Sequence, residues 1–300
     1  MFKKVCIIGC GLIGSSLARI IKKNNLAEKI VSSNRSDEVN EKVIKLKIVD
    51  DSSSDTKKMV DGSDFIIIAT PLSSYEDVII KIKNSLKNGA ILTDVGSVKG
   101  IIINLVEKHI PENVSWIPSH PIAGTEESGP ESGFAELFQN RWCILTPSKK
   151  AKEKDINLLQ TFWEKVGSKV DIMESKKHDH ILSITSHIPH LIAYNIVNTS
   201  LNLEDEKNFD IVKYSAGGLR DFTRIAASNP IMWRDVFIQN KHNTSKVIDK
   251  FIKNLEDLKK AIENEDGKKL EEVFIKTKKI RKDIIKAGQD VEKPNFGRKK

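Results

Sequence analysis

KVCIIGCGLIGSSLARIIKK, residues 4–23, joins a short β-branched run to a helical pattern through a glycine-rich turn. The spacing G-x-G-x-x-G follows the run KVCII directly and opens the helical pattern. In this context the first glycine allows the turn, the second lets a pyrophosphate approach the backbone, and the third lets the helix lie close to the strand. Phosphates would meet the free N–H groups at the helix N-terminus. We therefore expect the turn to bind a dinucleotide through Gly9, Gly11, Leu12, Ile13 and Gly14.

Short apolar runs alternate with helical patterns from this turn to about residue 172. The strand candidates are KVCIIG, KIVSS, DFIIIAT, GAILTDV, VSWIPS, RWCILT and KVDIM. Near-continuous apolar strands alternating with helices indicate one parallel sheet covered on both faces. The sequence therefore predicts a Rossmann-type, doubly wound α/β domain over residues 1–174.

After Glu174 the strand signals stop and only helical patterns follow. They cover residues 175–200, 205–214, 219–227 and 231–287. The stretch VFIQNKHNTSKVIDKFIKNLEDLKKAI has apolar stripes that would be costly to expose in a monomer. We expect an all-α dimerisation domain over residues 175–290, a homodimer formed through it, and a disordered tail over residues 291–300.

The composition excludes several classes of protein. Hydrophobic residues make up 39% and charged residues 30%, as in ordinary globular chains, and no apolar run approaches the ~18 residues of a membrane helix. Of the net charge of +8, most lies in residues 241–300, where lysine-rich helical faces explain it without nucleic acid. Cys6, Cys10 and Cys143 lack C-x-x-C spacing, so we expect a cytoplasmic protein without disulfides or a thiolate zinc site.

The end of the second strand, SSNRSDE, bears on the choice of cofactor. Asn34 occupies the position where an acid usually holds the ribose 2′-OH of NAD, and Arg35 and Ser36 follow it. A guanidinium without a competing carboxylate suits the 2′-phosphate of NADP. The stretch therefore favours NADP over NAD, although Asp37 would serve NAD if the turn were one or two residues longer.

Polar residues follow three later strands in the stretches ATPLSSYED, DVGSVKG and SHPIAGTEESG. The carboxyl ends of parallel strands meet at one edge of a sheet, where open α/β folds bind their ligands. We expect Thr70 and Pro71 to contact the cofactor there. Ser97 and His120 would lie beside its nicotinamide ring.

Five ordered segments resemble the prephenate/arogenate dehydrogenase family of tyrosine biosynthesis. They are CGLIGSSLA, DVGSVKG, SHPIAGTEESG, SHIPHLIA and GGLRDFTRIA, and they span most of the chain. The resemblance implies NAD(P)-dependent oxidative decarboxylation of prephenate to 4-hydroxyphenylpyruvate, or of arogenate to tyrosine. It implies that His120 takes the proton of the ring hydroxyl as hydride departs. Ser97 would orient the imidazole or bond the same hydroxyl.

The resemblance also implies that both halves of the chain bind the substrate. Arg224 would bind a substrate carboxylate, His190 would contact the substrate, and Glu126 would bond His190 or the substrate's side chain. The other implied substrate-binding residues are Thr125, Gly217 and Trp233.

Several of these residues have structural alternatives. His187 would pack or cap its helix, and Lys99 would cap a helix rather than touch substrate. His178, His180, His187 and His190 lack accompanying carboxylate or thiolate ligands, so we expect no metal. Two other functions stay open: another small-carboxylate NAD(P)-dependent dehydrogenase, or a catalytically inactive dinucleotide-sensing protein.

Overall fold

The computed structural model describes residues 1–202, 213–214 and 217–286. The chain divides into two compact units, Met1–Thr244 and Ser245–Lys300, which are described separately below. This division does not coincide with the domain boundary predicted after residue 174, which stays a prediction based on the change from strands to helices.

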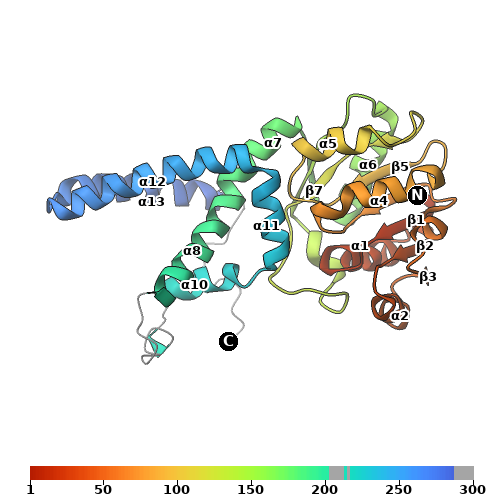
Figure 1. The fold of residues 1–300 in the computed structure, drawn as a ribbon, viewed down its shortest axis with the longest axis horizontal. Coiled ribbons are helices and arrows are strands. Elements are labelled where there is room, and N and C mark those ends of the chain that lie inside the picture. The colour runs from red at the N-terminus through yellow and green to blue at the C-terminus, as the bar shows by residue number, and fades with distance from the viewer. Residues whose placement is uncertain (203–212, 215–216, 287–300) are drawn as a thin grey trace. The chain divides into compact units, whose positions relative to one another are not determined.

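A six-stranded parallel sheet forms the core of the first unit (Figure 1). Its order is β3-β2-β1-β4-β5-β6, so the direction of winding reverses between β1 and β4. Such a reversal opens a ligand crevice beyond the carboxyl ends of the two strands. The doubly wound α/β fold predicted from the sequence is confirmed. The strands are β1 (Phe2–Ile8), β2 (Ala27–Ser33), β3 (Asp51–Ser52), β4 (Phe65–Ile68), β5 (Ile91–Asp94) and β6 (Ser115–Trp116).

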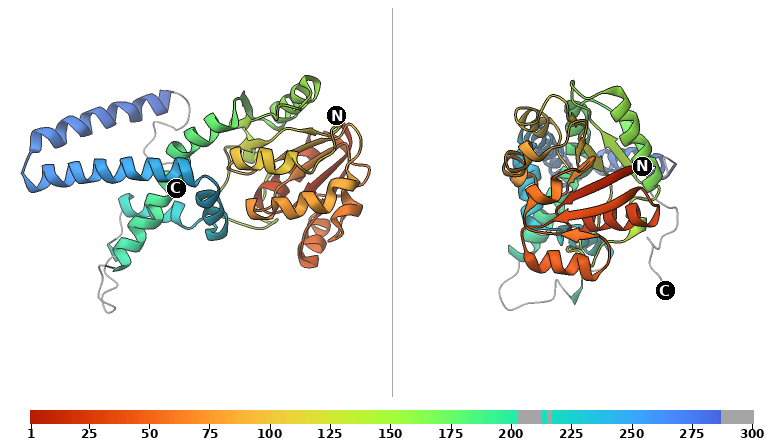
Figure 2. Two further views of the ribbon diagram at one scale, coloured as in Figure 1. Left: turned by 45° about the horizontal axis from the view of Figure 1, so that its top comes forward. Right: turned by 90° about the vertical axis from the view of Figure 1, so that its right-hand side faces the viewer.

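Helices cover both faces of this sheet, because its strands are apolar on both sides (Figure 2). On β1, Val5 and Ile7 belong to one core, whereas Cys6 and Ile8 belong to the other. The first core contains α1 (Leu12–Lys23) and α6 (Glu153–Val166), and the second contains α4 (Tyr75–Ile82) and α5 (Gly100–Glu107). Two further helices, α2 (Asp37–Lys45) and α3 (Thr56–Val60), connect the strands of the amino-terminal half.

The prediction that all seven strand candidates share one sheet is wrong for the last two. β8 (Trp142–Leu145) and β9 (Lys169–Ile172) form a separate sheet with β7 (Ser119–Pro121). β7 is antiparallel to β8, and β8 is parallel to β9. Pro118 and Pro121 flank Ser119 and His120, and since proline cannot donate to a ladder, the chain leaves the parallel sheet after β6.

The rest of the first unit is helical. The predicted segment 175–200 contains α7 (Ser175–Leu182), a π-helical turn η4 (Ser183–His187) and α8 (Ile188–Asn202). In η4 the N–H of Ile188 bonds the carbonyl of Ser183, five residues earlier. Pro189 has no N–H to continue a regular α-helix at this point. The prediction for 205–214 falls largely outside the described residues, as does that of a tail over 291–300.

The predicted helix 231–287 divides into three helices. They are α11 (Pro230–Gln239), α12 (Lys241–Glu263) and α13 (Gly267–Lys286), and α10 (Gly217–Ala226) precedes them. α10 packs on α8 in the first unit. In the second unit, α13 runs antiparallel to the end of α12 (Figure 2). Apolar side chains of this unit are exposed: Ile252, Leu255, Ile262, Phe274, Ile275, Ile280 and Ile284. None of the helices described is long and apolar enough to cross a membrane.

Candidate active site

The glycine turn after β1 has the shape that a pyrophosphate needs. A Cβ on Gly14 would lie 2.1 Å from the carbonyl oxygen of Gly9, so α1 can pack this closely only with glycine there. A Cβ on Gly11 would meet no protein atom within 4 Å. Protein packing therefore leaves Gly11 unexplained, whereas a ligand lying against the backbone would explain it. No side chain caps α1 and its first turn, which contains Leu12 and Ile13, has no acid, so its N–H groups suit an anion.

Two further predicted cofactor residues lie next to this turn. Thr70 and Pro71 follow β4, and a Cβ on Gly9 would lie 2.9 Å from the γ-methyl group of Thr70. The Thr70 hydroxyl accepts a hydrogen bond from Ser74, 2.9 Å away. These residues thus lie at the β1–β4 reversal, as the sequence predicts.

The side chain of Asn34, at the end of β2, forms hydrogen bonds with other residues of the protein and does not face the solvent where a ribose would bind. Its side-chain oxygen accepts a hydrogen bond from the N–H of Cys10 at 2.6 Å, and its amide donates to Asn40 at 3.0 Å. It is buried, whereas Arg35 and Ser36 are exposed. The end of β2 therefore presents a guanidinium and a hydroxyl ahead of the first residue of α2.

His120 is buried on β7, next to the carboxyl end of β5. Its Nδ1 lies 2.8 Å from Nε2 of His178, and Nδ1 of His178 lies 2.8 Å from a carboxylate oxygen of Asp179. Burial holds the pKa of His120 well below its usual range, and the charges of His178 and Lys99 lower it further. His178 and Asp179 were not predicted to lie at this site. In the sequence they are only an adjacent pair on an amphipathic helix, which does not indicate a contact with His120.

Lys99 supplies a buried positive charge close to this imidazole. Its ammonium bonds both carboxylate oxygens of Asp94, at 2.8 and 2.6 Å, and the carbonyl of Ser119 at 2.7 Å. Tyr75 donates to the same carboxylate at 2.9 Å. Lys99 does stand at the N-cap of α5, but its side chain connects β5 to β7 instead of capping the helix.

In the part of the chain described, Ser97 forms no hydrogen bond with His120, whose imidazole it was expected to orient. Nδ1 of His120 contacts His178 instead. Burial lowers the pKa of His187 to about 4, and the backbone of Ser97 partly opposes this by raising it. A hydrogen bond from Ser97 to the substrate hydroxyl stays a prediction.

A second group of predicted residues is brought together by α8, α10 and α11. Trp233 stacks on His190 with ring centroids 3.8 Å apart and planes 23° from parallel. Burial lowers the pKa of His190, and the charge of Arg224 lowers it further. Since Nδ1 of His190 donates to the carbonyl of Ser186 at 2.9 Å, its Nε2 is left for a ligand. The buried Nε1 of Trp233 has no hydrogen-bond partner among the residues described.

His187 lies between the two groups. It is fully buried, its ring is 6.2 Å from that of Trp233, and its charge acts on His120. Its Nδ1 contacts the amide of Asn240 at 3.1 Å. The prediction that His187 packs its helix agrees with this burial.

The remaining predicted substrate residues are exposed. The Thr125 hydroxyl accepts from the N–H of Glu127, and no contact between Glu126 and His190 is present among the described residues. Gly217 begins α10 and has open space beside it. The structure therefore does not bring these three to the imidazoles.

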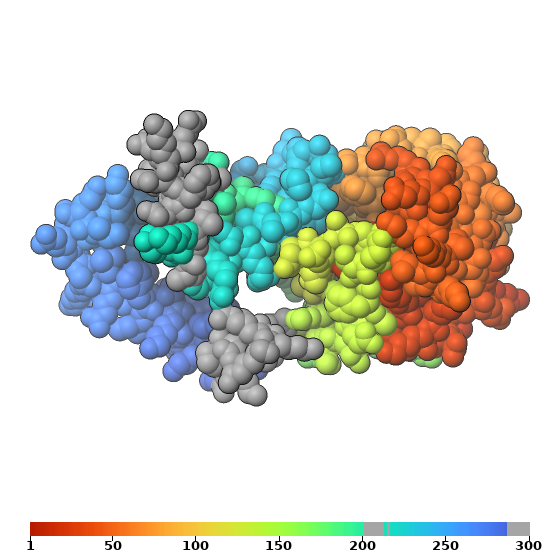
Figure 3. Space-filling model, turned by 90° about the horizontal axis from the view of Figure 1, so that it is seen from below, coloured from red at the N-terminus to blue at the C-terminus, as the bar shows by residue number. Residues whose placement is uncertain are grey.

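The loop after Glu126 continues across α1. The N–H of Phe134 donates to Ser16 at 3.1 Å, and Glu136 pairs with Lys23 at 2.6 Å. In Figure 3 this yellow-green segment lies on the surface beside the red and orange residues of the amino-terminal half. The loop that follows β7 is thus attached to α1, the helix predicted to bind the phosphates.

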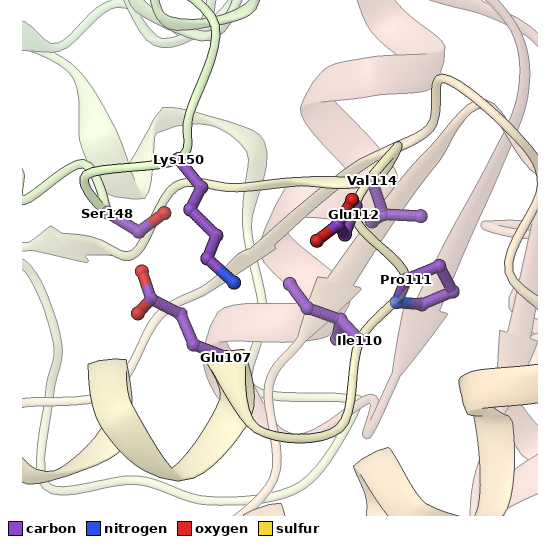
Figure 4. A pocket seen from close by; sticks show the side chains of 7 residues that line it. All are labelled: Glu107, Ile110, Pro111, Glu112, Val114, Ser148 and Lys150. Carbon is purple, nitrogen blue, oxygen red and sulfur yellow. The ribbon is translucent and has the colours of Figure 1, made fainter.

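A small pocket lies away from all these residues (Figure 4). Two buried oxygens at this pocket, Glu107 Oε1 and Ser148 Oγ, have no hydrogen-bond partner among the described residues. The pocket includes no predicted site residue. Its lining is Glu107, Ile110, Pro111, Glu112, Val114, Ser148 and Lys150. Within the described parts of the chain, no group of three His, Cys, Asp or Glu side chains could hold a metal ion.

A reversing parallel sheet, a glycine turn with room for a pyrophosphate and a buried neutral imidazole at the same edge define a nicotinamide-dependent dehydrogenase.

Known proteins narrow this class. Residues 17–172 match the family model described as prephenate dehydrogenase, nucleotide-binding domain, and residues 174–276 match prephenate dehydrogenase, dimerization domain. The chain is 37% identical to the cyclohexadienyl dehydrogenase of Zymomonas mobilis, over 94% of this chain and 96% of that protein. It is 31% identical to the prephenate dehydrogenase of Bacillus subtilis, over 97% and 78%.

A solved structure agrees with these matches. The prephenate dehydrogenase from Aquifex aeolicus, in complex with hydroxyphenyl propionate and NAD⁺, is 34% identical, with a TM-score of 0.88 over 95% of this chain and 99% of that one. The chain belongs to the prephenate dehydrogenase family, which confirms the resemblance noted from its motifs.

Proposed function

We propose that the protein catalyses the oxidative decarboxylation of prephenate to 4-hydroxyphenylpyruvate, using NADP or NAD. The observation that carries this proposal is the buried imidazole of His120, whose pKa the charge of His187 lowers, together with the stacked pair of His190 and Trp233 that lies next to His187. One end of this arrangement can accept a proton and the other can bind an anion.

When bound, the nicotinamide ring supplies the acceptor for a hydride. His120 takes the proton of the ring hydroxyl while hydride leaves the ring carbon that bears this hydroxyl. The electron pair of the bond to the ring carboxylate then moves through the ring to the oxygen, which releases carbon dioxide, makes the ring aromatic and lets the oxygen take a proton back from His120. Because burial lowers the pKa of His120, the imidazole is neutral and able to accept a proton at neutral pH.

Arg224 and His190 provide the substrate's carboxylate site in this proposal. A guanidinium can grip a carboxylate with two parallel hydrogen bonds, which fixes its orientation as well as its position. With Nδ1 of His190 bonded to Ser186, its Nε2 is the atom left to contact the substrate, and the stacked Trp233 holds the ring in place.

Prephenate is favoured over arogenate by the charges of this cluster. The ammonium group of arogenate would favour a nearby carboxylate. The acid implied for that place, Glu126, is exposed and forms no hydrogen bond or ion pair with His190, Trp233 or Arg224 among the described residues. Relatives that are 31% and 34% identical are named prephenate dehydrogenase, which supports the same choice.

NADP is favoured over NAD by the end of β2. With Asn34 turned inward, Arg35 is the exposed residue closest in sequence to the strand end, and it can pair with a 2′-phosphate. Asp37 begins α2 two residues later and is the group that would serve NAD. An Arg35→Gln variant should lose affinity for NADP and leave that for NAD unchanged.

We also propose a homodimer formed through the helices of the second unit. Ile262, Phe274 and Ile275 are each more than half exposed in the single chain. Large apolar side chains are costly to leave exposed, so we expect a partner to cover them, and the match of residues 174–276 to a dimerization domain supports this.

The test is the absorbance of reduced nicotinamide at 340 nm, with prephenate or arogenate paired with NAD or NADP. Reduction with prephenate, lowered about 10²–10⁴-fold in His120→Gln, is the expected result. His180→Gln is the matched control, because His180 is exposed and lies outside the imidazole pair. Cofactor binding without reduction in any pairing would instead support another carboxylate substrate or a dinucleotide sensor.

A further inference from the structure

We propose that His178 and Asp179 are positioning residues that fix the tautomer of His120, so that Nε2 of His120 is the atom that takes the substrate's proton. The inference rests on the proposed function for its kinetic consequence, but the tautomer itself can be measured without substrate.

The argument begins at the carboxylate of Asp179. One of its oxygens accepts the N–H of Lys99 at 2.8 Å, and the other accepts the N–H of Gly100 at 2.7 Å. Backbone N–H donors stabilise the ionised form of a carboxylate. The third contact, to Nδ1 of His178 at 2.8 Å, therefore has the acceptor on Asp179 and the proton on the imidazole.

That proton determines the rest of the chain of hydrogen bonds. A neutral imidazole has one N–H and one lone pair, so a proton on Nδ1 of His178 leaves its Nε2 as an acceptor. The 2.8 Å contact then requires Nδ1 of His120 to be the donor. His120 is left with its lone pair on Nε2, the nitrogen that faces away from His178.

Burial keeps both rings neutral, as this order of donors requires. Burial lowers the pKa of His178 as well as that of His120, while the bond to Asp179 raises it. The Lys99 ammonium lowers the pKa of both rings. A second proton on His178 would also place two donors opposite each other in the contact with His120.

The geometry around Gly100 shows that the carboxylate has a defined position. A Cβ on Gly100 would lie 2.7 Å from an oxygen of Asp179, so a larger residue would push the carboxylate away from α5. The last glycine of the DVGSVKG segment is thus explained by the approach of α7. Asp179 caps α5, orients His178 and determines the proton on its ring.

Asp179→Asn offers an amide in two orientations. The carboxylate oxygen that contacts Nδ1 of His178 also accepts the N–H of Lys99, whereas the other oxygen accepts the N–H of Gly100. With the asparagine oxygen toward Lys99, His178 keeps its proton on Nδ1; with the amide nitrogen there, His178 would carry its proton on Nε2 and donate to His120, whose proton would move to Nε2. In the Ser-His-Asp triad of serine proteases, replacing the aspartate by asparagine leaves the geometry intact and lowers kcat about 10⁴-fold.

The direct test is nitrogen-15 NMR of the histidine rings in the full chain at neutral pH, with His120→Gln used to assign the signal. We expect a proton on Nδ1 of His120 in the unaltered protein, and any fraction of Asp179→Asn that carries the His178 proton on Nε2 should carry the His120 proton on Nε2 as well. A proton on Nε2 of His120 in the unaltered protein would overturn the inference, whether or not the variant folds.

Kinetics provide the second readout. His178→Leu should lower kcat about 10²–10³-fold with KM changed less than about threefold, since general-base catalysis contributes about 10²–10⁴-fold. His178→Gln should recover at least about tenfold of this loss, because its side-chain oxygen can accept from His120. His180→Gln, on the same helix, should resemble the unaltered enzyme. A kcat in His178→Leu within about threefold of normal would sink the positioning role. Failure of the unaltered enzyme with all four substrate and cofactor pairings would refute the proposed function, while the NMR result would still decide the tautomer.

Discussion

Gly11 and Gly14 lie three residues apart in one turn, yet alanine should affect them in opposite ways. On Gly14 the added Cβ would lie 2.1 Å from the backbone oxygen of Gly9, well inside van der Waals contact. On Gly11 the added Cβ would have no protein atom within 4 Å. Gly14→Ala should therefore reduce stability, and Gly11→Ala should reduce cofactor binding.

The magnitudes follow from these contacts. A forced backbone shift costs about 3 kcal/mol, of which the better helix propensity of alanine returns about 1, so Gly14→Ala should lose about 2 kcal/mol of unfolding free energy. For Gly11→Ala, the poorer N-cap and the reduced freedom of the unfolded chain nearly cancel, to within about 0.5 kcal/mol. Loss of one charged hydrogen bond to the pyrophosphate, worth about 1.5–3 kcal/mol, should weaken the cofactor about 10–100-fold.

Urea unfolding followed by tryptophan fluorescence measures the first effect, and titration with NADPH and NADH measures the second. Stability has to be compared without cofactor, because bound cofactor would itself stabilise the protein. Gly11→Ala with normal affinity for both nucleotides would refute the pyrophosphate site. Equal destabilisation by the two variants would refute the assignment of Gly11 to ligand and Gly14 to packing.

Other predictions concern the rest of the molecule. Arg224→Lys should raise KM for prephenate about tenfold or more with a smaller effect on kcat, because lysine cannot reproduce the two-pronged contact; steady-state kinetics check this. Since the pKa of His187 is about 4 in the folded protein, the unfolded chain takes up its proton first as the pH falls below about 6.5. The stabilising effect of keeping His187 neutral is complete above about pH 6.5, and the stability lost between pH 7 and pH 5 in urea unfolding should be about 2 kcal/mol smaller in His187→Gln than in the unaltered protein. Lys99→Met would leave Asp94 buried and unpaired, and denaturation should show a loss of about 3–5 kcal/mol. Phe274→Asp should convert a dimer to monomers in analytical ultracentrifugation, and an unchanged mass would contradict the proposed interface.

The fold could be predicted where local pattern and long-range packing agree. The runs at Val5–Ile8 and Phe65–Ile68 are apolar on both faces, which only a sheet covered on both sides accommodates. The segment at Trp142–Leu145 has the same composition, but it pairs with β7 because two prolines turn the chain out of the first sheet. Strand partners depend on such breaks more than on the strand's own residues.

The site could be predicted only in part. In the sequence, His120 stands in a polar segment that follows a strand, where a histidine often has a functional role. His178 and Asp179 lie on an ordinary helix, and their contact with a strand 58 residues earlier has no local signature. Lys99 shows the same limit, because nothing near it in sequence reveals that its ammonium is buried against Asp94.

The π-helical turn η4 determines how far the side chains of α8 are rotated about the helix axis relative to those of α7. α7 before it carries His178, and α8 after it carries His190. One residue corresponds to about 100° of rotation in an α-helix, so deleting Thr185 to restore regular winding would turn the two histidines about a quarter-circle apart. Proton placement and anion binding could then no longer serve one substrate. A single-residue gap at this point in a related sequence would thus be a more telling sign of altered function than a substitution at many of the contacts themselves.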